Sequence, residues 1–297
     1  MTNYYNKYIK YKAKYLEYKN NIYGGSTSEE KNPPPIECPS IECPPPIKCE
    51  DYDPYDNPGF NYCKIYFPNV FDNKGKHVVD YKNLQLTCEG THSITYNHYS
   101  LQIIELMKKK ETLANCTIID LSANVGGDTI RFGLNFKSVR AIEYDKCNYN
   151  VLVHNVNEYG LLNNDNNDID SDKLKKGKNN VTLFLGDSTK IYQPNLEEWK
   201  TDIIYIDPPW GGPDYKCKDS ITFSFGGKKL EDYISSIGAT EFKPSYIFMK
   251  LPWNHNPKQF ERFKPTTVDI TKNKVINNKK VQERSFNILI IDTNNIQ

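Results

Sequence analysis

The sequence predicts an α/β fold in which a mostly parallel sheet carries a ligand site along one edge. Two observations indicate this fold. Four short apolar runs lead directly to a carboxylate, and they cover residues 117–120, 139–143, 181–187 and 203–207. A glycine turn and a helical pattern follow the first run, as in the strand and helix units of a parallel sheet. Because ligands of open α/β sheets bind at the carboxyl ends of the strands, the recurring acids predict one binding edge.

The first run ends at Asp120 and leads into a turn that contains Gly126 and Gly127. Glycines let the backbone approach a ligand closely, and the start of the following helix offers free N–H donors. The turn lacks the G-x-G-x-x-G fingerprint of dinucleotide sites. The acid at the strand end instead favours a ligand with a cationic amine.

The second and third runs end at Glu143 and Asp187. An acid at the tip of the second strand is placed to accept hydrogen bonds from a ribose diol. Each acid taken alone fits a helix N-cap or a solvated loop equally well. Their recurrence at successive strand ends favours ligand binding.

The fourth run is followed by Asp207, Pro208, Pro209 and Trp210. The prolines end the strand and lack N–H groups, so the carbonyls beside Asp207 can accept hydrogen bonds from a ligand. An exocyclic amine suits these acceptors, and the flat ring that carries it would stack on Trp210. The alternative is a proline turn beside a core tryptophan.

Four segments together carry a resemblance to a known family: residues 89–95, Val125-Gly126-Gly127, residues 141–145 and the Asp-Pro-Pro-Trp-Gly-Gly-Pro-Asp-Tyr string at 207–215. The chain resembles class I S-adenosylmethionine-dependent methyltransferases and, within them, the trimethylguanosine synthase family, which hypermethylates the RNA cap. The resemblance covers residues 80–260. It implies a Rossmann-like seven-stranded sheet with an N-terminal helical extension.

The resemblance also implies the site. The cofactor would be S-adenosylmethionine, and the partner would be RNA capped with 7-methylguanosine. Asp120, Glu143 and Asp187 would hold the methionine, ribose and adenine parts of the cofactor. The remaining residues of the expected cofactor site are Thr95, Gly126, Asn155 and Pro208, and those of the substrate site are Pro209, Trp210, Tyr215, Lys250 and Asn254.

Asp207 and Trp210 are the expected catalytic residues. A 7-methylated guanine carries positive charge, so stacking on Trp210 gains a cation–π attraction of about 0.5–2 kcal/mol. Asp207 would orient the exocyclic N2 and take its proton, while catalysis would come mainly from positioning. No covalent intermediate and no metal are required.

The chain departs from the family pattern at several positions. Asp207 stands where the family has serine, Asp128 ends the glycine turn where the family has asparagine, and Trp253 replaces an arginine. Residues 91–92 replace a Trp-Phe pair, and residues 122–124 replace Phe-Cys-Gly. These changes leave the reaction class intact.

Two other classes of function remain open. One is an amine methyltransferase acting on adenine N6 in DNA, or on guanine N2 in tRNA or ribosomal RNA, because these enzymes use a similar Asp-Pro-Pro-aromatic loop. Trp210 and the wide turn at residues 211–213 favour the cap instead. The other is a cap-binding module without activity, against which the presence of Asp120, Glu143 and Asp187 argues.

Composition divides the chain into four parts. We expect an amphipathic Tyr/Lys-rich leader helix at residues 1–25, a Pro/Cys-rich linker at 26–59, an N-terminal extension over the substrate pocket at 60–112 and the catalytic core at 113–297. The leader resembles those of many giant DNA virus proteins, which indicates a viral source. We favour a monomer.

Charge and cysteine usage complete the expectations. The net charge of +1 is uninformative, so RNA would need a local basic patch, for which the candidates are Lys243, Lys250, Lys258, Arg262 and Lys264. No apolar stretch reaches the ~18 residues of a membrane span, so we expect a soluble, non-secreted protein of the host cytoplasm or viral factory, or one packaged in the virion. The eight cysteines form no Cys-x-x-Cys pair, which favours free thiols over a metal site.

Overall fold

The computed structural model describes residues 43, 45–51, 62–71, 74–75, 77–164, 175, 177–195, 197–211, 213–276 and 279–296. Residues 1–44 and 45–297 form two separate units, and every helix and strand below belongs to the second. The leader helix expected at residues 1–25 lies outside the described residues.

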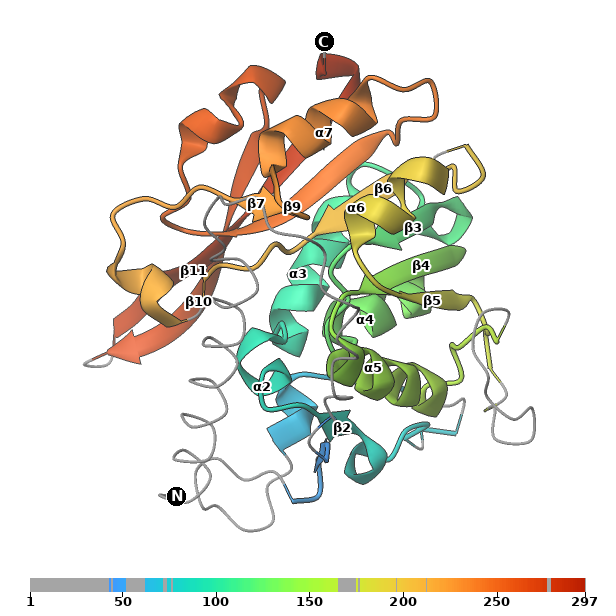
Figure 1. The fold of residues 1–297 in the computed structure, drawn as a ribbon. Helices are drawn as coiled ribbons and strands as arrows, with labels where there is room; N and C mark the ends of the chain where they lie inside the picture. Colours follow the sequence, from blue (N-terminus) through green and yellow to red (C-terminus); the bar gives the residue numbers. More distant parts are fainter. Residues whose placement is uncertain are drawn as a thin grey trace, which may run out of the picture. The chain divides into compact units, whose positions relative to one another are not determined.

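A seven-stranded sheet forms the centre of the second unit (Figure 1). Its strands lie in the order β10, β11, β9, β6, β3, β4, β5. Their bounds are Thr266–Ile276, Lys279–Asp292, Tyr246–Pro252, Ile203–Ile206, Thr117–Asp120, Ser138–Glu143 and Val181–Leu185 respectively. The five strands from β9 to β5 run parallel, whereas β11 pairs antiparallel with both β9 and β10. The expected α/β fold with seven strands is confirmed.

The sheet has a switch point between β3 and β6. From β3 the chain adds β4 and β5 on one side, and it then returns to add β6 and β9 on the other. Connections leave β3 and β6 in opposite directions, so the loops that follow these two strands flank a crevice at their carboxyl ends. Asp120 ends β3, and Asp207 directly follows β6.

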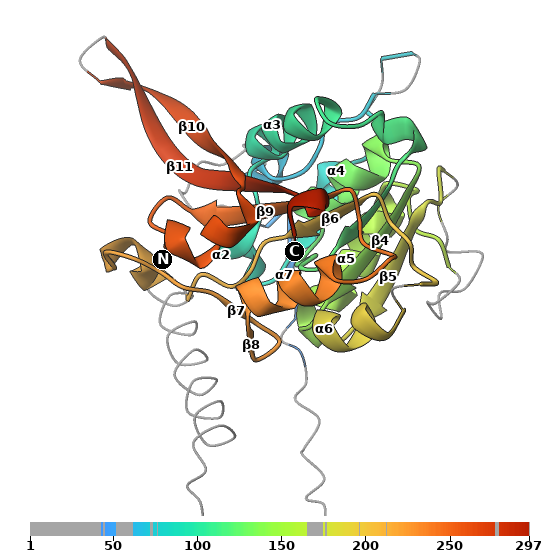
Figure 2. The ribbon, with the colours of Figure 1, turned by 90° about the horizontal axis from the view of Figure 1, so that it is seen from above.

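Helices cover both faces of the sheet because the strands are apolar on both sides. The helices α3 (Asn97–Lys108), α4 (Gly127–Asn135) and α5 (Lys146–Glu158) contribute apolar side chains to the core on one face. The helix α7 (Leu230–Gly238) packs on the other face, together with residues that flank α6 (Ser188–Ile191). Figure 2 shows α3 and α4 on one side of the sheet and α6 and α7 on the other.

Shorter elements connect these layers. The strands β1 (Ile47–Lys48) and β2 (Gln85–Leu86) pair with each other, as do β7 (Ser224–Phe225) and β8 (Lys228–Lys229). The short helix α2 spans Gly90–Ser93. The 3-10 helices are Tyr62–Ile65, Tyr81–Asn83, Leu113–Asn115, Gln193–Asn195, Pro213–Cys217, Pro257–Gln259, Glu261–Phe263 and Thr293–Asn295. No helix in the described ranges is long and apolar enough to cross a membrane.

The segment before the core is tied to it more closely than composition indicated. Residues 47–48, within the range expected to be a linker, pair with β2. Cys49 and Cys63 are both buried and form a disulfide. Cys43 is in a disulfide, and Cys147 is in a disulfide, so the expectation that the cysteines are free thiols is wrong for four of them. Cysteine spacing alone gave no sign of these bonds.

The hairpin of β10 and β11 continues beyond the sheet. β9 pairs only with residues 286–292 of β11, whereas β10 and β11 stay paired as far as Ile276 and Lys279. Phe286 pairs with Pro252, the last residue of β9. The outer part of the hairpin therefore extends past the carboxyl edge of the sheet, as Figure 2 shows.

Candidate active site

The loops that follow β3 and β6 are joined to each other. The backbone N–H of Asp207 donates to Ser122 Oγ at 2.7 Å, and the N–H of Leu121 donates to the Tyr205 carbonyl at 3.0 Å. These bonds hold the loop of Asp207 against the glycine turn. The two motifs that the sequence singled out therefore form one site at the switch point.

The glycine turn is shaped by backbone conformations that few residues adopt. Gly126 has φ of 100° and caps the N-terminus of α4. A Cβ atom on Gly127 would lie 2.7 Å from Ile94 Cγ1, so this position admits only glycine without a shift of the segment before α3. Asn124, at φ 51°, also lies in the left-handed region, and its own Oδ1 accepts a hydrogen bond from the Val125 N–H.

Asp120 lies inside the site and is only 1% exposed. Its carboxylate accepts hydrogen bonds from the Ser122 N–H at 3.1 Å and from Thr129 Oγ1 at 2.7 Å. Burial nevertheless raises the pKa of Asp120 to about 7. A cationic ligand group beside this carboxylate would offset its loss of solvation.

Glu143 is also buried, at the end of β4. One oxygen accepts from the Asn124 N–H at 2.6 Å and the other from the Asp145 N–H at 2.8 Å. Burial raises its pKa to about 7. The carboxylate therefore fixes the glycine turn to the second strand and remains able to accept further hydrogen bonds, because each oxygen has two lone pairs.

Asp187 follows β5 and caps α6. Its carboxylate accepts hydrogen bonds from the Thr189 N–H at 3.0 Å and from Thr189 Oγ1 at 2.7 Å. This is the N-cap role that each acid could have had on sequence grounds. Next to it, Ser188 Oγ donates to the Leu121 carbonyl at 2.6 Å, so α6 is fixed to the loop after β3.

A buried polar cluster connects α4 to the segment before α3. Asp128 Oδ2 accepts hydrogen bonds from Thr95 Oγ1 at 2.6 Å and from the Tyr205 hydroxyl at 3.1 Å. Asp128 Oδ1 is buried and has no hydrogen-bond partner among the described residues. Thr95 was expected at the site, whereas Tyr205, Ser122 and Thr129 were missed.

Asp207 forms a buried ion pair with Lys250 of β9. Lys250 Nζ lies 2.6 Å from Asp207 Oδ2 and 2.9 Å from Thr95 Oγ1. Burial raises the pKa of Asp207 to about 6, although Lys250 opposes the shift. Burial by itself would lower the pKa of Lys250, but Asp207 and Asp128 outweigh it and raise that pKa. Both groups are therefore charged at neutral pH.

Trp210 lies next to this ion pair in a group of aromatic rings. The ring centroids of Trp210 and Tyr215 are 5.1 Å apart in a T-shaped arrangement, and that of Phe286 is 6.5 Å from Trp210. Lys250 Nζ lies 5.3 Å from the centroid of the Trp210 ring, within cation–π range. Pro208 is buried and Pro209 is exposed, so the second proline faces solvent.

Two asparagines of the expected site hold its loops. Asn155 Oδ1 accepts from the Gln85 N–H, and its Nδ2 donates to the carbonyls of Gln85 and Val125, each at 2.9 Å. Asn254 Nδ2 donates to the carbonyls of Tyr215 and Lys218 at 2.8 and 2.7 Å. Asn155 thus positions the glycine turn, and Asn254 positions the loop after Trp210.

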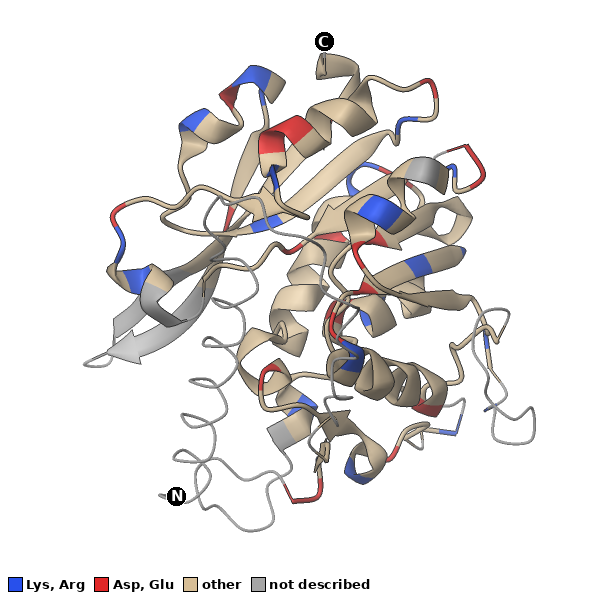
Figure 3. Cartoon of the chain, in the orientation of Figure 1, with Lys and Arg blue, Asp and Glu red and all other residues tan. Residues whose placement is uncertain are grey.

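Three of the five basic residues expected to form a patch, Lys258, Arg262 and Lys264, lie on the connection between β9 and β10, and the other two lie elsewhere. Lys250 is buried in the site, Lys243 Nζ donates to the Thr293 carbonyl, and Arg262 donates to the Glu231 carbonyl and to Ser235 Oγ. Figure 3 shows basic residues spread over the chain, with several acidic ones gathered in the middle of the view. Lys258 and Lys264 line the same surface hollow, so a basic patch at this connection stays a prediction.

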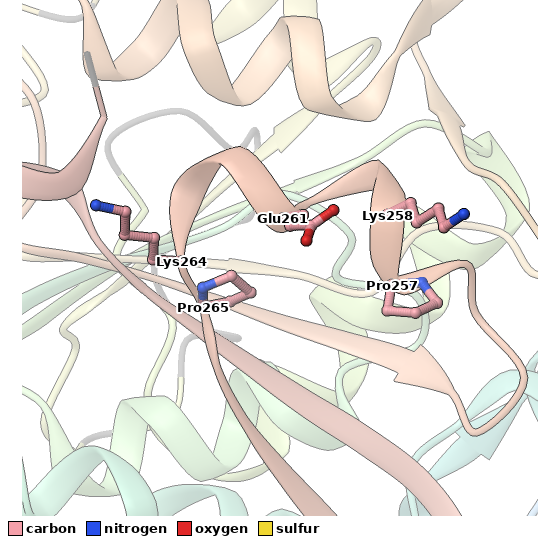
Figure 4. Close-up of a pocket in the computed structure, with 5 residues that line it drawn as sticks. All are labelled: Pro257, Lys258, Glu261, Lys264 and Pro265. Carbon is pink, nitrogen blue, oxygen red and sulfur yellow. The ribbon is translucent and has the colours of Figure 1, made fainter.

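A separate surface hollow of about 460 Å³ lies on the connection between β9 and β10. Its lining residues are Pro257, Lys258, Glu261, Lys264 and Pro265 (Figure 4). It contains none of the residues expected to bind cofactor or base. In the part of the chain that the structure describes, no group of three His, Cys, Asp or Glu side chains could hold a metal ion.

Comparisons with known proteins agree with this geometry. A family model described as RNA cap guanine-N2 methyltransferase matches residues 115–291. An uncharacterized protein of Acanthamoeba polyphaga mimivirus is 27% identical over 189 residues, which are 62% of this chain and 66% of that protein. The trimethylguanosine synthase of Saccharomyces cerevisiae is 24% identical over 191 residues, 62% of this chain and 53% of the enzyme.

A second fungal enzyme and a solved structure are also similar to this chain. The trimethylguanosine synthase of Schizosaccharomyces pombe is 27% identical over 151 residues, 49% of this chain and 54% of the enzyme. The alignments thus span between half and two thirds of these relatives' lengths. A SAM-dependent O-methyltransferase from Thermotoga maritima has a TM-score of 0.43 at 13% identity, covering 67% of this chain and 66% of that one.

The strand order and the acid-lined switch point define a class I methyltransferase, a class whose cofactor is S-adenosylmethionine. The family match covers more than half of the chain. The chain belongs to the RNA cap guanine-N2 methyltransferase family. The resemblance seen in the sequence is confirmed at this level, while the roles of single site residues remain predictions.

Proposed function

We propose that this protein transfers methyl groups from S-adenosylmethionine to the exocyclic N2 of the 7-methylguanosine cap of RNA. The observation that carries the proposal is the placement of Asp207 and Trp210 on the loop after β6, joined through Ser122 to the glycine turn. A hydrogen-bond acceptor and an aromatic ring thus lie beside the proposed cofactor site. Family membership supports the choice of the cap.

The acids of the first two strands fit the cofactor. Asp120 is a buried carboxylate with a raised pKa, so it would gain from the cofactor's ammonium group. Glu143, at the tip of β4, would accept hydrogen bonds from the ribose, and Asp187 at the end of β5 would face the adenine. When bound, S-adenosylmethionine supplies an electrophilic methyl group.

The residues of the β6 loop would hold the base. Trp210 provides the stacking surface, and Tyr215 packs edge-on against it, which fixes the indole plane. Because Lys250 Nζ lies over the indole, we place the base on the opposite face. Asp207 would accept a hydrogen bond from N2, orient its lone pair and take its proton as the amine is methylated.

A substrate panel tests this proposal. The purified chain is incubated with labelled S-adenosylmethionine and one of four acceptors: 7-methyl-GpppA, GpppA, a duplex DNA with adenine sites and an uncapped RNA hairpin. We expect label only in 7-methyl-GpppA. Label in DNA adenine or in internal guanine would replace the proposal by one of the other amine methyltransferase activities.

Binding measurements separate an inactive module from an enzyme. Calorimetry with S-adenosylmethionine should show binding that Asp120→Asn weakens. Binding of the cap without binding of the cofactor, and without transfer, would indicate a cap-binding protein instead. The viral relative and the proposed capped-RNA substrate support a place of action inside an infected cell, in the host cytoplasm or viral factory.

A further inference from the structure

One buried lysine is shared between two acids of the site. Lys250 Nζ contacts Asp207 Oδ2 directly at 2.6 Å. It also donates to Thr95 Oγ1 at 2.9 Å, and the Thr95 hydroxyl donates to Asp128 Oδ2 at 2.6 Å. Lys250 is 5% exposed and Asp128 is 9% exposed, so water screens these charges only weakly.

The cluster carries more negative than positive charge. Two carboxylates, Asp128 and Asp207, face a single ammonium group. Asp128 Oδ1 is buried and unpartnered within the described ranges, and Lys250 takes up only one of the two oxygens of Asp207. Other titratable groups that face Asp207 are Asp120 on β3, Tyr205 on β6 and Tyr215 in the 3-10 helix after Trp210.

We propose that Asp128, Asp207 and Lys250 form one charged unit, and that its excess negative charge makes the site select a positively charged purine over a neutral one. The inference rests on the proposed function, because 7-methylguanine is such a purine. Methylation at N7 spreads positive charge over the ring and makes the N1 and N2 hydrogens stronger donors. A carboxylate acceptor at the base edge therefore gains more from the methylated base than from guanine.

Lys250 acts in this unit as a positioning residue. By bonding Oδ2 it restricts the rotation of the Asp207 carboxylate and directs Oδ1 to the base. It also keeps Asp207 ionised, since an ammonium group at 2.6 Å favours the charged carboxylate. Asp128 offsets the repulsion that Lys250 alone would exert on a cationic ring.

The test compares binding of 7-methyl-GpppA and GpppA by tryptophan fluorescence, as a ratio of dissociation constants over a range of pH. The variants are Asp207→Asn, Lys250→Met and the double variant. Lys243→Met is the matched control, because Lys243 is also partly buried but bonds the Thr293 carbonyl outside the site. A hydrogen bond to a charged group corresponds to roughly tenfold in affinity or more, so Asp207→Asn should lower the ratio by about that factor.

The pH dependence distinguishes positioning from a merely structural role. On the acid side, the ratio for the natural protein should fall as pH drops through about 6, where Asp207 takes up a proton. Lys250→Met should move this fall to higher pH, because the ammonium no longer lowers the pKa of Asp207. The double variant should show a low ratio without this pH dependence, and Lys243→Met should match the natural protein.

Two results would overturn the inference: an unchanged ratio in Asp207→Asn, or an unchanged pH dependence in Lys250→Met. If Lys250 had only a structural role, Lys250→Met would instead weaken binding of both caps equally. Because the readout is binding, it is independent of methyl transfer. If the binding ratios are as predicted but no methyl group reaches N2, only the proposed activity is refuted. If the natural protein binds neither cap, both the proposed activity and this inference are refuted.

Discussion

The backbone N–H of Asp207 is bonded to the side chain of Ser122, across the switch point between β6 and β3. The N–O distance is 2.7 Å. Ser122 directly follows the loop residue Leu121 and precedes the glycine turn, so this bond couples the proposed base site to the proposed cofactor site. A change at Ser122 should thus affect the alignment of the two ligands rather than the binding of either one.

Ser122→Ala leaves the Asp207 N–H without its acceptor. We expect a loss of about 0.5–1.5 kcal/mol in stability and a lower kcat on 7-methyl-GpppA, with KM for both ligands nearly unchanged. Steady-state kinetics and thermal melts check this. The control is Ser236→Ala, because the Ser236 hydroxyl donates to the Tyr233 carbonyl on α7, away from the site. Equal effects of the two variants on kcat would argue against a coupling role.

Asp120→Asn should stabilise the ligand-free protein at alkaline pH. Burial raises the pKa of Asp120 from 3.8 to about 7, so the folded chain binds this proton more tightly than the unfolded chain does. Stability attributable to Asp120 is therefore lost as pH rises from about 4 to 7. The amide can still accept from the Ser122 N–H and can donate to Thr129 Oγ1. We expect a Tm several degrees higher near pH 8, at roughly 2–4 °C per kcal/mol.

The same variant should weaken binding of the cofactor. In the natural protein, affinity for S-adenosylmethionine should fall as pH drops through about 7, because Asp120 becomes protonated and no longer attracts the ammonium group. Asp120→Asn should bind weakly across this range with a flatter pH dependence. Calorimetric titrations at several pH values measure both effects. Natural affinity in the variant would exclude Asp120 from the cofactor site.

Trp210→Ala should remove most of the preference for a methylated cap that stacking provides. A cation–π term of about 0.5–2 kcal/mol corresponds to roughly 2–30-fold in the ratio of kcat/KM for 7-methyl-GpppA and GpppA. Trp210→Phe should retain part of it. Trp199→Phe provides the control, since Trp199 packs in the core with its ring centroid 4.3 Å from that of Phe184. It should lower Tm and leave the ratio unchanged.

Gly127→Ala should disturb the segment before α3. The added Cβ atom would lie 2.7 Å from Ile94 Cγ1, and overpacking of this kind costs about 1–3 kcal/mol. Displacement of Ile94 would also move Thr95, which bonds Asp128 and Lys250. We expect a lower Tm and weaker cap binding. Ile94→Ala in the same chain makes room for the methyl group and should restore part of both, whereas absence of any rescue would point to a different cause.

The sheet and its acid-tipped edge could be predicted because they depend on local patterns. Buried parallel strands require continuous apolar runs, and the acids at their ends are visible as breaks in those runs. The burial of the acidic side chains could not be predicted from these local patterns. Asp120 and Glu143 are both buried, and Asp120 is held by Ser122 and by Thr129 of α4, a residue nine positions along the chain.

The charged cluster could not be predicted from sequence, because its members lie far apart in the chain. Asp207 and Lys250 are 43 residues apart, and Asp128 and Tyr205 are 77 apart. Pairing of β6 with β9 brings the first two together. One indication was present among the residues themselves, since Asp128 and Asp207 both depart from the family pattern toward an acid. The structure places both beside the same lysine.

The most direct test of the account is mass spectrometry of 7-methyl-GpppA after incubation with the chain and S-adenosylmethionine, with fragmentation that assigns each added methyl group to an atom. We predict one or two methyl groups on N2 of the 7-methylguanine, almost none with GpppA, and greatly reduced product with Asp207→Asn. Methyl groups on the ribose, on the adenine or on any atom other than N2 would contradict the account.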